Sequence, residues 1–94
     1  IPFNGKRVLI LGDMLELGKY SDDEHRLITE FLRGVNDIEV LLVGEYFSRN
    51  SSGYKSFRDV DELNSWLLNQ SIQNSLVLLK GSRGMRLEKA FFSL

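Results

Sequence analysis

Residues 7–18 read RVLILGDMLELG, and this stretch decides the fold. Residues 7–11 form a largely apolar run, which is typical of a parallel β-strand covered on both faces. The loop that follows, from Gly12 to Gly18, contains two acids and is longer than most strand-to-helix connections. Ligands of open α/β sheets bind beyond the carboxyl ends of the strands. The loop is therefore a candidate binding site.

The rest of the chain supplies the strands that would pair with this one. Two further runs, 38–43 and 76–79, are apolar without polar alternation, and both predict buried parallel strands. A weaker run at 54–57 alternates in polarity and predicts an edge strand.

Helical periodicity separates the predicted strands. Within 22–35 an apolar face recurs at helical spacing, behind a capping-box pair formed by Ser21 and Glu24. The members of this face are Leu27, Ile28, Phe31, Leu32 and Val35. A second helix is predicted over 60–70 with Asp59 as its N-cap, and a third from about residue 84 to the last residue.

This alternation predicts an α/β fold, namely a Rossmann-like, open and mainly parallel sheet of about four strands with flanking helices. A length of 94 residues suits a single domain over 1–94 with one core. Because the chain begins with Ile-Pro rather than methionine, we expect it to be a piece of a longer protein.

Composition excludes several classes of function. Twelve basic residues against thirteen acidic ones leave a net charge of −1, so nothing attracts nucleic acid or an anionic membrane over long range. The absence of cysteine excludes disulfides and thiolate metal sites. No apolar run approaches the roughly 20 residues that span a bilayer, and a cytoplasmic location is compatible with the sequence.

A second glycine-punctuated loop, Lys80-Gly81-Ser82-Arg83-Gly84, follows the strand predicted at 76–79. Its glycines allow a close backbone approach, and the start of the next helix would present free N–H groups to an anion. Lys80 and Arg83 add positive charge, so the loop suits a carboxylate or a phosphate. The alternative, an ordinary strand-to-helix turn with charged surface residues, stays open, because short glycine motifs are weak evidence.

Three ionisable residues in and after the first loop are candidates for chemistry. Asp13 or Glu16 could bind Mg²⁺ or orient a cationic amine. The alternative is that the acids face water while Met14, Leu15 and Leu17 close the top of the core. His25, the only histidine, has no second histidine or cysteine with which to build a metal or nucleophilic site, so we expect a structural or positioning role.

Two further stretches have alternative interpretations. The aromatic residues of 45–48 follow Gly44 at the same edge of the predicted sheet, where they would stack on a ligand, pack in the core or cap a helix. The polar segment 48–53 is the best candidate for a mobile loop.

The spacing of these residues closely resembles that of the Mur ligases. The family pattern runs Gly-Asp-Met, one residue, Glu-Leu-Gly, a short gap, Ser, and His four residues later. Here it matches Gly12 to Gly18, then Ser21 and His25. The stretch 79–88 resembles the last strand, loop and helix of the same family, and the resemblance covers essentially the whole chain.

The resemblance implies the carboxy-terminal domain of an ATP-dependent amide ligase of peptidoglycan synthesis. The family branch that it resembles adds D-alanyl-D-alanine to UDP-N-acetylmuramoyl-tripeptide. It uses ATP and Mg²⁺, and the resemblance implies two further domains that this chain lacks: a central ATPase with the P-loop, and a domain for the UDP-sugar substrate. The Asp-Asp-Tyr-Asn type of segment that opens the family's third domain is also missing, and with it one strand.

By resemblance, Lys80, Gly81, Ser82 and Arg83 would bind the incoming dipeptide. Gly12, Asp13, Glu16 and Gly18 would shape the closed cleft near ATP, and His25 matches a position of the family pattern to which the resemblance assigns no definite role. We expect the isolated chain to be inactive because it has no P-loop. We also expect copies of the chain to associate with one another, because a sheet that lacks a strand exposes an unpaired edge. Alternatives are a stand-alone, non-catalytic module that binds a nucleotide or an anion, and a domain used only for protein interaction.

Overall fold

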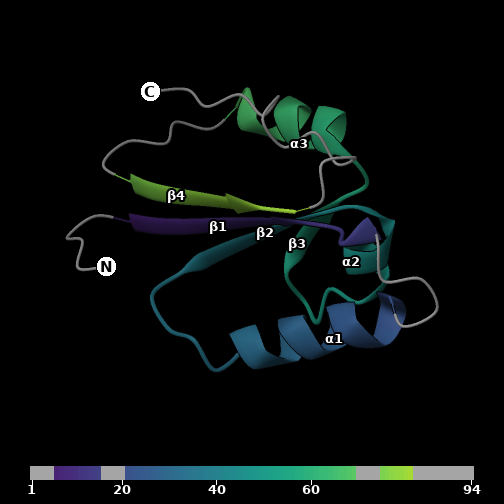
Figure 1. Cartoon of the computed structure of the whole chain (residues 1–94). Coiled ribbons are helices and arrows are strands. Elements are labelled where there is room, and N and C mark those ends of the chain that lie inside the picture. The colour runs from purple at the N-terminus through teal and green to yellow at the C-terminus, as the bar shows by residue number, and fades with distance from the viewer. Residues whose placement is uncertain (1–5, 16–20, 70–74, 82–94) are drawn as a thin grey trace.

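A computed structural model describes residues 6–15, 21–69 and 75–81 (Figure 1). Strands and helices alternate along these residues, as the sequence predicts. In chain order the elements are β1 (Lys6–Gly12), α1 (Ser21–Leu32), β2 (Glu39–Val43), α2 (Glu45–Arg49), β3 (Lys55–Phe57), α3 (Val60–Leu67) and β4 (Ser75–Lys80). The third predicted helix, from about residue 84, lies outside the described residues.

The strands form one parallel sheet in the order β3-β2-β1-β4. β1 lies inside the sheet and pairs with β2 on one side and β4 on the other, which explains its continuous apolar run. The weaker run becomes the short edge strand β3, as predicted. The predicted fold class, an open parallel α/β sheet with flanking helices, is therefore confirmed.

Side chains alternate in direction along β1 and β2 and pack into two separate cores. Figure 1 shows α3 on one face of the sheet and α1 with α2 on the other. The core under α3 consists of Val8, Ile10, Leu41, Val43, Phe57, Val60, Leu63 and Leu67. The core under α1 and α2 consists of Leu9, Leu32, Val40, Leu42 and Phe47. Helices on both faces leave the carboxyl ends of the strands open to loops, where ligands of such folds bind.

Helix α1 differs from its prediction in the face that it buries. Leu27, Phe31 and Val35 are exposed, with 54%, 75% and 40% of their surface accessible, so the predicted apolar face is wrong at these positions. The helix instead buries Ser21, His25, Thr29 and Leu32, and it ends at Leu32 rather than at residue 35. Hydrogen bonds to other elements make this polar burial possible.

The hydroxyl of Thr29 shows how such a bond holds α1 in place. Its oxygen lies 2.8 Å from the carbonyl oxygen of Asn50 and 2.9 Å from the hydroxyl of Ser52. Arg33 also donates a hydrogen bond to the carbonyl oxygen of Ser52. Three hydrogen bonds therefore anchor the segment that the sequence marks as the best candidate for a mobile loop.

Helix α3 begins as its sequence predicts. The carboxylate of Asp59 accepts a hydrogen bond from the backbone N–H of Glu62 at 2.9 Å, and Trp66 packs at the edge of the α3 core. We expect Asp59→Ala to lower the free energy of unfolding by about 1 kcal/mol, because one N–H of the first turn loses its acceptor. Urea denaturation measures the change. Asp59→Ser keeps a capping oxygen and is the matched control; equal stability of the two variants would contradict the capping role.

Across the three described segments, no helix combines the length and the apolar character needed to cross a membrane.

Candidate functional site

The carboxyl ends of β1 and β4 meet at one edge of the sheet. The two strands are parallel neighbours, and Leu11 pairs with Lys80 in their register. The chain passes from β1 to β2 on one side, whereas β4 lies on the other side, so the strand order reverses at β1. In open α/β sheets this reversal is where ligands bind.

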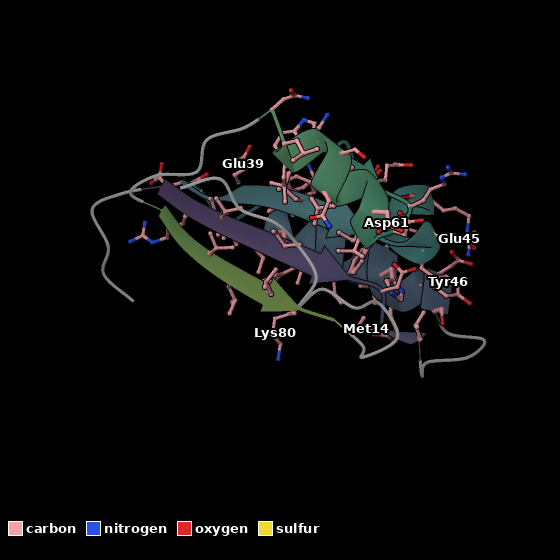
Figure 2. The ribbon with its side chains drawn as sticks, turned by 90° about the horizontal axis from the view of Figure 1, so that it is seen from above. Met14, Glu39, Glu45, Tyr46, Asp61 and Lys80 are labelled. Carbon is pink, nitrogen blue, oxygen red and sulfur yellow. The ribbon has the colours of Figure 1, made fainter. Side chains whose placement is uncertain are left out.

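A cavity of about 380 Å³, here called the rim cavity, lies at this reversal. It is lined by Leu11, Gly12, Met14, Ile28, Phe47, Lys80 and Gly81. Figure 2 shows Met14 and Lys80 at the same end of the sheet, with Lys80 at the end of β4 and Met14 just after β1. The structure therefore brings together the described parts of the two predicted loops.

The lining of the rim cavity is apolar except at one charged residue. Met14, Ile28 and Phe47 supply side-chain walls, while Gly12 and Gly81 expose backbone. Lys80 supplies the one charge of this lining and is exposed. This combination suits a small ligand that has apolar parts and one negative charge.

Asp13 is buried beside the rim cavity, with 2% of its surface exposed. One carboxylate oxygen accepts the backbone N–H of Tyr46 at 2.8 Å, and the other accepts that of Phe47 at 2.9 Å. Asp13 thus satisfies the first turn of α2, whose N–H groups have no acceptor inside the helix.

This position corrects one interpretation of the first loop. Asp13 does not face water, and Leu15 is 48% exposed rather than packed over the core. Both oxygens of Asp13 are occupied by backbone donors. Among the described residues, no group of three or more His, Cys, Asp or Glu side chains is placed to hold a metal ion.

His25 is fully buried against the same loop. Its Nε2 accepts the backbone N–H of Met14 at 2.9 Å, and its Nδ1 lies against the carbonyl oxygen of Ser21. An acceptor nitrogen carries no hydrogen, so the ring is neutral with its hydrogen on Nδ1, donated to Ser21. The 3.8 Å between Nε2 and the Asp13 carboxylate is therefore a contact of two acceptors rather than an ion pair.

Gly44 completes this arrangement and was missed by sequence reasoning. Its φ is 125°, and a Cβ on it would lie 2.2 Å from the Cγ of Asp13. Only glycine leaves room for the buried carboxylate while turning the chain from β2 into α2. The signal was present in the sequence, since Gly44 directly follows a continuous apolar strand and precedes a short helical segment.

The aromatic residues after Gly44 belong to α2. Phe47 is buried in the core, as the interpretation of this segment as packing predicts. Tyr46 is half-buried and stacks on His25, with ring centroids 5.2 Å apart, while Phe47 meets His25 edge-on at 4.4 Å. Both rings help to enclose the histidine.

A second cavity, of about 480 Å³, lies where α2 and α3 begin. Its lining comprises Asp13, Leu15, Gly44, Glu45, Tyr46, Arg49, Arg58, Asp59, Val60 and Asp61. The two arginines there are paired within the chain, Arg49 with Asp22 and Arg58 with Glu62, each at 3.2 Å. Hydrogen bonds from Asn50 and Arg49 lower the pKa of Asp22, and the bond to Asp22 raises the pKa of Arg49.

Four of the predicted site residues, Glu16, Gly18, Ser82 and Arg83, lie outside the described residues. Their roles stay predictions. Of the others, Gly12, Lys80 and Gly81 line the rim cavity, while Asp13 and His25 are buried behind it.

Known proteins similar to this chain are found among curated sequences and among solved structures. No protein-family model matches the chain. The chain is 34% identical over 95 residues to UDP-N-acetylmuramoyl-tripeptide–D-alanyl-D-alanine ligase of Rickettsia prowazekii, and the match covers 95% of this chain and 21% of the relative. It is 37% identical over 101 residues to the ligase of the same name from Haemophilus influenzae, covering 98% of this chain and 22% of the relative.

Solved structures agree with the sequence comparison. A crystal structure of MurF from Acinetobacter baumannii superposes with a TM-score of 0.75 at 30% identity, covering 90% of this chain and 20% of that chain. A second crystal structure of the same protein gives a TM-score of 0.73 at 29% identity, covering 90% and 21%. The chain thus spans about a fifth of the length of the relatives that it matches.

The aligned sequences and the superposed fold agree: over nearly its whole length this chain is similar to one part of the MurF-type ligases, which supports the predicted resemblance to a carboxy-terminal domain of the Mur ligases.

Proposed function

We propose that this chain is the part of a peptidoglycan-synthesising ligase that positions the incoming D-alanyl-D-alanine for addition to UDP-N-acetylmuramoyl-tripeptide. The observation that carries the proposal is the rim cavity, where Gly12 and Met14 face Lys80 and Gly81. Its relatives are ligases of that name, which supports the reaction class.

The chemistry of the rim cavity suits this dipeptide. D-Alanyl-D-alanine carries two methyl groups and one carboxylate. The walls formed by Met14, Ile28 and Phe47 would contact the methyl groups, and the ammonium group of Lys80 would bind the carboxylate. Ser82 and Arg83 would add donors to the same carboxylate. A bound and oriented dipeptide loses the freedom that otherwise makes amide formation slow.

ATP would contribute the activated phosphoryl group, and the resemblance assigns Gly12, Asp13, Glu16 and Gly18 to its surroundings. Gly12 lines the rim cavity and permits a close approach of backbone to a ligand. Asp13 has both oxygens engaged by α2, so we assign it to holding the loop in place rather than to Mg²⁺. We propose that Mg²⁺ and most ATP contacts come from other parts of the full-length enzyme, and that the isolated chain is inactive.

We predict that Lys80→Ala in the full-length ligase raises the KM for D-alanyl-D-alanine about tenfold, because a charge-assisted hydrogen bond to the carboxylate is lost. Steady-state kinetics with each substrate varied in turn measure the change. Lys80→Arg keeps the charge, and we expect it to stay within about threefold of the wild type. Lys55→Ala, at the opposite edge of the sheet on β3, is the matched control and should leave the KM unchanged.

An unchanged KM for D-alanyl-D-alanine in Lys80→Ala would contradict the proposal that the dipeptide binds in the rim cavity. Calorimetric titration of the isolated chain with ATP separates the stand-alone binding module from a ligase domain. Tight binding of ATP by this chain alone would support the module and count against the ligase assignment of the cavity.

A further inference from the structure

Two buried ionisable residues, Asp13 and His25, lie directly behind the rim cavity without lining it as Lys80 does. His25 is fully buried and Asp13 nearly so, and all of their described polar atoms are engaged with backbone groups. Neither residue belongs to the lining of the rim cavity. Their partners, however, are residues of the cavity wall.

Each of the two residues holds one wall of the rim cavity. His25 accepts the N–H of Met14 at 2.9 Å, and Met14 lines the cavity. Asp13 accepts the N–H of Phe47 at 2.9 Å, and Phe47 lines the cavity from the side of α2. The ring of His25 also packs edge-on against Phe47, with centroids 4.4 Å apart. The two walls thus share one buried support.

The support joins four elements. Asp13 follows β1 and bonds to α2, while His25 belongs to α1 and bonds to the loop after β1. Gly44, at the end of β2, leaves the space that the Asp13 carboxylate fills. A change at His25 would therefore reach Met14 through their hydrogen bond and Phe47 through the contact between the rings.

We propose that His25 is a positioning residue for the dipeptide site: as a neutral acceptor it fixes the backbone of Met14, with Asp13 fixing Phe47, so that these two walls are placed against the apolar part of the ligand. The effect on catalysis rests on the proposed function, whereas the hydrogen bond itself does not.

The hydrogen bond is tested by nuclear magnetic resonance on the ¹⁵N-labelled 94-residue chain. A nitrogen that accepts an N–H shares a scalar coupling with the donor nitrogen. We expect a coupling between the Met14 amide nitrogen and the Nε2 of His25, together with ¹⁵N shifts that place the ring hydrogen on Nδ1. A hydrogen on Nε2, or no coupling to Met14, would overturn the proposal.

Two substitutions separate the two ends of the imidazole in the full-length ligase. His25→Gln places an acceptor oxygen near the position of Nε2 and so preserves the bond to Met14. His25→Asn places a donor near the position of Nδ1, which preserves the bond to Ser21 but is too short to reach Met14.

We expect His25→Asn to raise the KM for D-alanyl-D-alanine about three- to tenfold, the worth of one hydrogen bond, with the KM for ATP unchanged. His25→Gln should restore the KM for the dipeptide to within about twofold. A purely structural role predicts instead less folded enzyme, seen as a lower apparent kcat with an unchanged KM, in both variants. That result, or equal KM values in the two variants, would overturn the positioning role.

The outcomes for the two proposals are distinct. A wild-type ligase that does not use D-alanyl-D-alanine would overturn the proposed function, and the nitrogen coupling would still decide for or against the bond between His25 and Met14.

Discussion

Replacing Gly44 with alanine is expected to lower the free energy of unfolding by about 4 kcal/mol, enough to unfold most of a small domain. The backbone of Gly44, at φ 125° and ψ 163°, lies in a region that is essentially restricted to glycine. A methyl group would also collide with the Asp13 carboxylate, with a Cβ–Cγ separation of 2.2 Å. Moving the carboxylate aside would break its bonds to Tyr46 and Phe47.

Chemical denaturation followed by circular dichroism measures this loss. Gly53→Ala is the matched control, because Gly53 also has a positive φ, of 90°, but its added Cβ would meet only the end of the flexible Arg33 side chain, at 3.3 Å. We expect Gly53→Ala to cost about 1 kcal/mol. Similar losses in the two variants would show that backbone conformation alone accounts for the effect and that the fit of Asp13 against Gly44 contributes nothing.

Removing the Asp13 carboxylate is the second substitution with a large expected effect. Asp13→Ala should lower the free energy of unfolding by about 3 kcal/mol, because two buried backbone N–H groups lose their acceptors at once. Asp13→Asn keeps one acceptor oxygen, and we expect it to lose about half as much. The midpoint of urea denaturation at constant slope gives both values.

Asp61→Ala is the control for this series, since Asp61 is an exposed acid in the first turn of α3 and lines the same second cavity. We expect a change within about 0.5 kcal/mol. An Asp13→Ala variant as stable as Asp61→Ala would refute the assignment of Asp13 to α2 and would favour a direct role in ligand binding.

Those parts of the fold that depend on local pattern were predicted well. The strands β1 and β2 were evident because both of their faces are covered, which makes the apolar residues continuous. A similar run predicted β4, but the predicted burial is wrong there, since β4 is the last strand in the sheet order and Leu78 and Leu79 are 56% and 36% exposed. The start of α3 was evident because Asp59 and the N–H that it binds are only three residues apart. The shared edge of the two loops followed from the parallel direction of β1 and β4.

The face that α1 buries could not be predicted in the same way. Leu27 and Phe31 are apolar but exposed, whereas Thr29 and His25 are polar and fully buried. Burial of the polar pair depends on acceptors and donors supplied by Asn50 and Met14, which belong to other elements. Helical periodicity contains no information about such partners.

The role of Asp13 was hidden for the same reason. A loop acid directly after a strand is compatible with a metal site, a ligand contact or a helix cap. The choice is made by the N–H groups of Tyr46 and Phe47, which lie 33 and 34 residues further along the chain. The geometry of Gly44, which admits the carboxylate, was likewise visible only in three dimensions.

The pairing of β1 with β4 also constrains the order of events during folding. β1 is the first described strand and β4 the last, so the central strand acquires one of its two neighbours only after nearly the whole described chain has been synthesised. Contacts between such distant segments close slowly because the intervening chain must lose its freedom first. The nascent protein therefore carries an unprotected strand edge on the ribosome, where chaperones would act and where premature association of neighbouring chains would begin.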